Sequence, residues 1–346
     1  MDLKLDSAPV DPVRLHRMTT DAIARDETGW RKRSLVSLLT IEPRQLVAAL
    51  ELAWLLKRLD LARKPVRAPN TGLWSYPRTL ALLFEKPSLR TRVSFEVCMA
   101  HLGGHTIYLA PGDVGLGARE PVCDVAEVLS RWVDCIAARV FDHASVQELA
   151  DKASVPVINA LSDLEHPCQA VADLLTVLEK KGRLGPDIKL AYVGDGNNVL
   201  HALMAACAHV GVRISAACPA GYCPSDEYVS ATRELSRRNG FGDLLELSRD
   251  PASAVADADV VYTDVWTSMG QEAERNERLV IFRPYQVNDE LMAHARPDAI
   301  VMHCLPAHHG EEISESVFQR HKDVILEQAE NRMHTQKALI ALTVGP

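Results

Sequence analysis

The chain has 346 residues, of which 47% are apolar and 24% are charged, a balance typical of a soluble globular enzyme. This length suffices for two domains, and the net charge of −8 argues against general affinity for nucleic acid. No apolar run reaches the roughly 18 residues of a membrane span, and residues 1–30 lack the order of a secretory signal. The eight cysteines form no CxxC pair, which predicts reduced thiols in a cytoplasmic protein.

Strand and helix patterns alternate along most of the chain, after a polar extension of unknown role at residues 1–34. Apolar segments predict strands near 79–84, 106–109, 134–140, 156–160, 188–194, 212–217, 258–263 and 299–303. Amphipathic patterns predict helices near 43–59, 122–132, 145–153, 166–181, 198–210, 225–239, 287–294 and 327–344. Such alternation predicts an α/β protein with parallel sheets flanked by helices, whose ligands bind beyond the carboxyl ends of the strands.

The domain division is predicted at the helix that starts near His166, because this helix follows a completed set of strands. We therefore expect one domain over residues 35–164, a second over 165–326, and an active site in the cleft between them.

The first chemical signal is FEKPSLRTRVSFEVCMAHLGG, residues 84–104, which follows an apolar strand. Ser88 is predicted to cap a helix that ends at Gly103-Gly104. The free N–H groups of such a helix start attract anions, and Ser88, Arg90, Thr91 and Arg92 add two hydroxyls and two guanidiniums. Arginines oppose the helix dipole there, so a phosphate site is favoured over a merely solvated basic turn.

Two further signals follow strands of the first domain. Arg139 ends an apolar strand, where a charge needs either a ligand or a structural ion pair. His166 precedes Pro167, a residue suited to the first turn of a helix, and Gln169 follows on the same side. An imidazole at a helix start stays neutral more easily and can donate to an oxyanion, although a lone His-Pro is more often a simple cap.

Three signals follow strands of the second domain. Gly194-Asp195-Gly196-Asn197-Asn198 imitates a dinucleotide fingerprint, but Val199 replaces the third glycine and the next strand ends without an acidic residue. Asp264 is placed to pair with an ammonium, or belongs to an ordinary charged surface loop. The cluster of His303, Cys304, His308 and His309 invites a metal assignment, but no second ligand set supports one, and a buried thiol beside a core histidine is the alternative.

Five of these motifs resemble those of the transcarbamylases. FEKPSLRTR resembles their carbamoyl-phosphate motif, usually S-T-R-T-R, and HPCQ resembles their H-P-x-Q element. DVWTSMGQE, starting at Asp264, resembles the ornithine-recognising loop of ornithine transcarbamylases, which aspartate transcarbamylases lack. HCLP likewise resembles the ornithine enzymes rather than the aspartate enzymes, and ENR, ending at Arg332, matches a family arginine. The resemblance runs from about residue 35 to 344.

The resemblance implies the conversion of carbamoyl phosphate and ornithine to citrulline and phosphate, with no metal or organic cofactor. It implies that the final helix, within residues 327–346, packs on the first domain, and that the protein is a homotrimer or a multiple of trimers. It assigns the phosphate and carbamoyl group to Ser88, Arg90, Thr91, Arg92, Arg139, His166, Gln169, Cys304, Leu305 and Arg332. It assigns ornithine to Asn198, Asp264, Ser268 and Met269, with Arg90, Arg139, His166 and Cys304 catalytic.

Three positions depart from the family pattern: Leu89 replaces the commoner threonine, Gly115 stands where relatives supply a polar side chain to a neighbouring subunit, and His309 stands where many have arginine. Three alternatives stay open. The acceptor could be another amine, such as putrescine or an acylated ornithine. The chain could also be a non-catalytic binding paralogue or, more distantly, a nicotinamide-dependent dehydrogenase. The motifs fit arginine biosynthesis and arginine breakdown equally.

Overall fold

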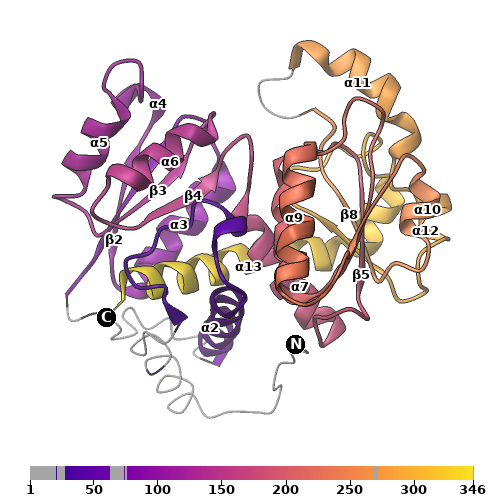
Figure 1. Ribbon diagram of the computed structural model, residues 1–346, viewed down its shortest axis with the longest axis horizontal. Coiled ribbons are helices and arrows are strands. Elements are labelled where there is room, and N and C mark those ends of the chain that lie inside the picture. Colours follow the sequence, from indigo (N-terminus) through magenta and orange to yellow (C-terminus); the bar gives the residue numbers. More distant parts are fainter. Residues whose placement is uncertain (1–20, 22–27, 63–73, 75, 268–271, 346) are drawn as a thin grey trace. The chain divides into compact units, whose positions relative to one another are not determined.

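The computed structural model describes residues 21, 28–62, 74, 76–267 and 272–345 (Figure 1). The chain forms two compact units, which we name by their sheets. The four-stranded unit contains the described residues up to Leu175 together with those from Asn331 onward, and the five-stranded unit spans Thr176–Glu330. The first division falls inside a helix, α7 (Pro167–Lys181), whereas the sequence placed the domain break at the start of that helix.

The sheet of the four-stranded unit has the order β2-β1-β3-β4, and all its strands are parallel. Its strands are β1 (Thr79–Phe84), β2 (His105–Leu109), β3 (Cys135–Arg139) and β4 (Val157–Leu161). Its helices are α2 (Pro43–Ala62), α3 (Leu89–Leu102), α4 (Pro111–Val114), α5 (Val122–Leu129) and α6 (His143–Lys152), with a 3-10 turn at Leu38–Thr40. Phe84 pairs with Arg139, so the carboxyl ends of the two central strands lie level and present their following loops together.

The sheet of the five-stranded unit has the order β7-β6-β5-β8-β9 and is also parallel throughout. Its strands are β5 (Lys189–Val193), β6 (Arg213–Ala217), β7 (Leu245–Ser248), β8 (Val260–Thr263) and β9 (Ile300–His303). Its helices are the end of α7, then α8 (Asn198–Val210), α9 (Asp226–Arg238), α10 (Pro251–Val255), α11 (Arg275–Phe282) and α12 (Asp289–Met292), with 3-10 turns at Glu272–Glu274 and Arg283–Tyr285. Every residue of α8 from Val199 to Val210 is buried, as expected of a helix that is apolar on all sides.

The last helix, α13 (Glu315–Val344), starts in the five-stranded unit and ends in the four-stranded unit. The sequence predicted the start of this helix near residue 327, but the helix begins at Glu315. The earlier start was missed because the first turns are polar and show no clear apolar period. None of the described helices is both long enough and apolar enough to cross a membrane.

The predicted alternation of strands and helices in parallel sheets is confirmed, but the sequence patterns missed β7 and the short helices α4, α10 and α11. Strand β7 was missed because it is a short edge strand whose two central residues, Glu246 and Leu247, are exposed. Helix α11 lies in a segment interpreted as a polar loop; among its residues, Arg278 and Phe282 are buried.

Candidate functional site

The start of α3 has the geometry predicted for an anion site. Ser88 caps the helix, and its Oγ accepts a hydrogen bond from the Thr91 N–H at 3.3 Å. Gly103 ends the same helix with a left-handed φ of 82°, as predicted for a glycine cap. The cap leaves the first N–H groups of α3 pointing out of the helix end, beyond the carboxyl end of β1.

Thr91 links this helix start to α13. The Thr91 side chain is buried, and Arg332 donates from Nη2 to its Oγ1 at 3.0 Å. Both residues belong to the four-stranded unit, although 241 positions separate them in the sequence. The sequence had suggested that Arg332 lies at the start of the last helix, but it lies well inside α13.

The two arginines of the motif have different surroundings. Arg92 is exposed, pairs with Glu96 at 2.9 Å and lies over the Tyr108 ring, 3.9 Å from its centroid. Arg90 is half-buried and has no ion pair among the residues that the structure describes. The structure therefore separates Arg92 from the buried Thr91–Arg332 contact and leaves the Arg90 guanidinium available for an anion.

His166 lies directly before α7, where its carbonyl accepts the first helical hydrogen bonds, from Gln169 and Ala170. Burial lowers the pKa of His166 well below its usual range, and the neighbouring Arg332 and Arg139 lower it further. The side chain is therefore a neutral imidazole in the folded protein. Its Nδ1 is buried and has no hydrogen-bond partner within the described part of the chain.

Gln169 and Arg139 are the remaining predicted anion-binding residues of the four-stranded unit. Gln169 donates from Nε2 to Asp173 Oδ1 at 2.8 Å, while its buried Oε1 has no hydrogen-bond partner among the described residues. Arg139 ends β3 as predicted and is 7% exposed. We call the group the anion cluster: Ser88, Arg90, Thr91, Arg139, His166, Gln169 and Arg332. Buried polar atoms without partners cost about 1–3 kcal/mol each, a cost that a ligand with matching groups would relieve.

Two residues of this region were not predicted from the sequence. Lys86 is buried, its Nζ lies 4.5 Å from the Phe141 ring centroid, and burial together with Arg139 lowers its pKa. Glu165 is fully buried, and its Oε2 accepts from the Leu38 N–H at 2.9 Å, which fixes the residue next to His166. In the sequence, Lys86 and Glu165 could be noticed only as charged residues adjoining the motifs at Ser88 and His166.

The loop after β5 owes its glycines to close packing. A Cβ on Gly196 would lie 2.2 Å from the Pro224 nitrogen, and Gly194 has a φ of 145°. Asn197 caps α8, and its Oδ1 accepts from the N–H groups of Val199 and Leu200 at 2.9 and 3.3 Å. The glycines of this loop are therefore explained without a dinucleotide.

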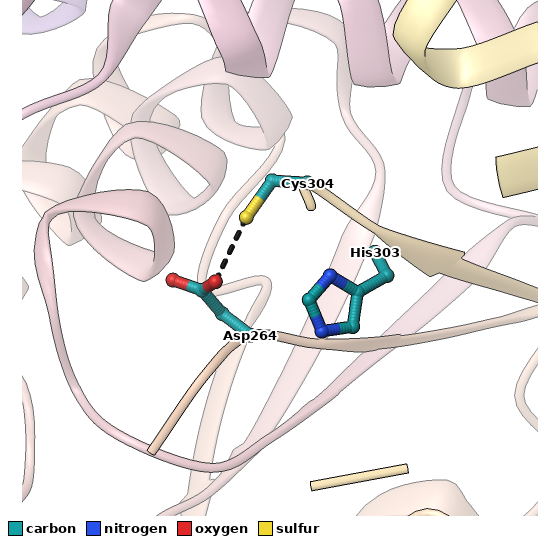
Figure 2. Close-up of side chains that lie close together, drawn as sticks. All are labelled: Asp264, His303 and Cys304. Carbon is teal, nitrogen blue, oxygen red and sulfur yellow. Dashed lines mark hydrogen bonds between the residues drawn. The ribbon is translucent and has the colours of Figure 1, made fainter. Parts of the chain in front are cut away.

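Asp264 and Cys304 follow the neighbouring strands β8 and β9, and the structure brings their side chains together (Figure 2). Cys304 Sγ donates to Asp264 Oδ1 at 2.9 Å, and the Val265 N–H donates to the same oxygen at 2.8 Å. The other oxygen, Oδ2, accepts from Asn197 Nδ2 at 2.8 Å. Asn197, Asp264 and Cys304 form what we call the Asp264 cluster.

Asn197 contacts Asp264, which the sequence did not predict; the assignment of Asn198 to the amino-acid substrate stays a prediction. Asn198 is the first residue of α8 and is half-buried. Ser268 and Met269, the other predicted residues of this region, lie outside the described residues. A further unpredicted residue, Arg278, is buried and pairs with Asp195 at 2.5 Å while donating to the Trp266 carbonyl, so it ties the loops after β5 and β8 together.

Asp264, His303 and Cys304 also place potential metal ligand atoms within 4.8 Å of one another. His303 is poorly suited to bind a metal here, because both ring nitrogens are engaged. Its Nε2 bonds to Glu312 Oε1 at 2.9 Å, and its Nδ1 accepts from the Leu305 N–H at 2.9 Å. The cluster is therefore explained by hydrogen bonding within the protein.

Comparison with known proteins covers almost the whole chain. Residues 33–179 match the family model described as aspartate/ornithine carbamoyltransferase, carbamoyl-P binding domain. Residues 186–343 match the model described as the Asp/Orn binding domain of the same family.

Individual relatives agree with these matches. The chain is 50% identical over 313 residues to ornithine carbamoyltransferase from Pyrococcus abyssi, covering 90% of this chain and 96% of the relative. It is 54% identical over 268 residues to the Pyrococcus furiosus protein named ornithine carbamoyltransferase, anabolic, covering 78% of this chain and 84% of the relative. A solved structure of ornithine carbamoyltransferase from Pyrococcus furiosus matches with a TM-score of 0.84 and 49% identity over 91% of this chain and 97% of that chain.

Proposed function

Since the chain belongs to the aspartate/ornithine carbamoyltransferase family, we propose that it transfers the carbamoyl group of carbamoyl phosphate to the δ-amine of L-ornithine. The products are L-citrulline and phosphate. The observation that supports the choice of amino acid is Asp264, a carboxylate only 5% exposed at the end of a parallel strand, hydrogen-bonded to Cys304. A buried carboxylate at this position suits the α-ammonium of an amino acid.

The phosphate is held at the start of α3, where the helix N–H groups, Ser88 and Thr91 supply hydrogen bonds and Arg90 supplies charge. Arg90 has no ion pair within the part of the chain that the structure describes, and this supports the assignment. Arg92 was also predicted to take part, but it would have to leave Glu96 and Tyr108 to do so. We therefore assign Arg92 the smallest contribution of the four residues.

The carbamoyl group is bound by Arg139, His166, Gln169 and Arg332. A neutral His166 can donate one hydrogen bond to the carbamoyl oxygen without adding a third positive charge beside the two arginines. The free Oε1 of Gln169 can accept from the carbamoyl amide. The arginines offset the negative charge that develops on the oxygen in the tetrahedral intermediate. Cys304 and the backbone of Leu305 are proposed to contact the same group.

Ornithine is bound by Asn198, Asp264, Ser268 and Met269, which leaves its δ-amine near Cys304. The δ-amine must lose its proton before it attacks, because an ammonium has no lone pair; activity is therefore expected to rise with pH. A bond forms between this nitrogen and the carbamoyl carbon, the bond from that carbon to the phosphate oxygen breaks, and the departing phosphate takes the second proton of the amine. Carbamoyl phosphate is already activated, so positioning and charge stabilisation supply the catalysis.

A homotrimeric, cytoplasmic enzyme of arginine biosynthesis is the biological setting that we propose. The name of the Pyrococcus furiosus relative, which includes the word anabolic, supports the biosynthetic direction. Gly115 has a left-handed φ of 62° and no side chain to offer a neighbouring subunit, so any contact between subunits at the phosphate would come from another residue.

The decisive experiment measures carbamoyl transfer from carbamoyl phosphate to ornithine, putrescine and N-acetylornithine side by side. Ornithine should react far faster than the other two, because putrescine has no carboxylate and N-acetylornithine has no α-ammonium for Asp264. Faster reaction of either alternative would keep the anion cluster but overturn the choice of amine. Absence of product with every amine would place the chain among non-catalytic binding proteins.

A further inference from the structure

Glu312 is a buried carboxylate whose contacts are directed towards the end of β9. It is 0% exposed and lies between that strand and α13. Its Oε1 accepts two hydrogen bonds, from His303 Nε2 at 2.9 Å and from the His308 N–H at 2.6 Å. Such a residue is costly to bury, so its contacts call for a specific explanation.

The His303 ring lies between Glu312 and the backbone of Leu305. Nδ1 accepts from the Leu305 N–H at 2.9 Å, so this nitrogen carries no proton and the proton of the neutral ring is on Nε2. Nε2 donates that proton to Glu312. The backbone N–H of His303 donates to Gln328 Oε1 at 2.9 Å, which holds the strand end from the other side.

The residue that receives this support has an unfavourable backbone. Leu305 has a φ of 60°, a left-handed conformation that costs a residue with a side chain roughly 1–2 kcal/mol. The bond from its N–H to His303 helps to hold that conformation. Cys304 lies between His303 and Leu305, so the same bonds hold the backbone from which its Sγ reaches Asp264 (Figure 2).

We propose that Glu312 is a positioning residue for carbamoyl transfer: through the His303 ring it holds Leu305 and thereby directs the Cys304 thiol at Asp264. This inference rests on the proposed function, because Cys304 is placed there near the reacting δ-amine of ornithine and Asp264 is assigned to the α-ammonium of the same substrate. What Glu312 supplies is an acceptor at a fixed distance, rather than a charge.

Three substitutions of Glu312 distinguish the effect of its side-chain length from the effect of its charge. Glu312→Gln keeps both the length and an acceptor oxygen, Glu312→Asp keeps the charge but shortens the side chain by one methylene, and Glu312→Ala removes both. Glu311→Ala is the matched control, because the neighbouring Glu311 pairs with Arg275 and His308 and not with His303. Melting temperature is recorded for each variant, so that a loss of folding is recognised.

Two readouts are measured on the full chain: steady-state kinetics with ornithine and carbamoyl phosphate, and the rate at which iodoacetamide labels Cys304, followed by peptide mass spectrometry. In the Ala and Asp variants we expect kcat to fall roughly 10- to 100-fold, as for a reacting group displaced by about 1 Å. The inhibition constant of inorganic phosphate should stay within about twofold, because the anion cluster is untouched. Labelling of Cys304 should change severalfold in the same two variants, whereas Glu312→Gln and Glu311→Ala should resemble the wild type in both readouts.

The proposal is overturned if the folded Asp variant keeps both wild-type kcat and wild-type labelling, or if Glu312→Gln loses as much as Glu312→Asp. If Glu312→Ala does not fold, the comparison of Gln with Asp still decides. Labelling does not depend on the reaction, so a wild-type protein that fails to make citrulline would contradict the proposed function and leave the test of Cys304 placement intact.

Discussion

The two units present their polar site residues in opposite states. In the four-stranded unit, buried His166 Nδ1 and Gln169 Oε1 have no hydrogen-bond partner among the described residues. In the five-stranded unit, both oxygens of Asp264 are already occupied, by Asn197 on one side and by Cys304 and Val265 on the other. The anion cluster is thus open before a ligand arrives, whereas the Asp264 cluster is closed on itself.

The difference determines what a ligand can gain in each unit. A group that meets an unsatisfied buried atom relieves a cost of about 1–3 kcal/mol, whereas one that replaces an existing hydrogen bond gains only the difference between two bonds. We therefore expect the anion cluster to bind phosphate without any amine, and the Asp264 cluster to bind an amino acid weakly without the anion. Removing the side chain of a single residue should therefore reduce kcat/KM more in the anion cluster than in the Asp264 cluster.

The largest loss is expected from Arg90→Ala. This change removes the one motif guanidinium that has no ion pair among the described residues, and it should reduce transition-state stabilisation by roughly 3 kcal/mol or more. Measured as kcat/KM for carbamoyl phosphate, the loss is at least about a hundredfold.

Arg92→Ala is the matched comparison, because it removes the same side chain from a position paired with Glu96 and Tyr108. Its effect should be at least about ten times smaller than that of Arg90→Ala, as expected of an exposed, already paired arginine. Equal losses of kcat/KM in the two variants would show that Arg92 leaves Glu96 to contact the anion, and that both arginines are available to the ligand. Near-normal kinetics in Arg90→Ala would refute the phosphate assignment.

A smaller loss, confined to the amine, is expected from Asp264→Asn. The substitution removes the charge that is proposed to pair with the ammonium. The new amide also cannot accept at both ends, because its NH₂ would face either the Asn197 NH₂ or the Cys304 thiol and Val265 N–H. We expect kcat/KM for ornithine to fall roughly 30- to 100-fold, about 2–3 kcal/mol. The inhibition constant of phosphate should not change. A parallel loss of phosphate affinity would show that the two clusters are coupled and that their contrast is not local.

Much of the fold was predictable because its information is local. The apolar runs of β1 and β5 and the caps Ser88 and Gly103 each act within a few residues, and the structure agrees with them. The polar strand β7 and the early start of α13 were not predictable, because edge pairing and packing against distant chain stabilise them.

The candidate site divides in the same way. The resemblance to the transcarbamylase motifs singled out Asp264 and Cys304, and the adjacency of β8 and β9 explains why their side chains meet. Glu312 and Arg278 were missed, because neither belongs to a short pattern and each acts through contacts that form only in the folded chain, with His303 and with Asp195 respectively. The contact of Asn197 with Asp264 was not predicted, since only the backbone geometry at the start of α8 shows that the Asn197 side chain caps the helix and reaches Asp264.

The smallest predicted effect is a pH dependence of the free energy of unfolding, which arises from the buried, neutral His166 of the anion cluster. Burial, Arg332 and Arg139 keep the pKa of His166 well below 6.5, so the folded protein holds it neutral while the unfolded chain protonates it. The unfolded state therefore takes up the extra proton, and the stability associated with this residue is complete above pH 6.5 and is lost as the pH falls below that value. Between pH 6.5 and 5.5 the loss is about 1 kcal/mol, within a limit of about 1.4 kcal/mol per pH unit for one proton. Urea unfolding at pH 7.5, 6.5 and 5.5 should show a shallower decline for His166→Gln than for the wild type. Identical declines would mean that His166 is protonated in the fold, and that the cluster stays open without a neutral imidazole.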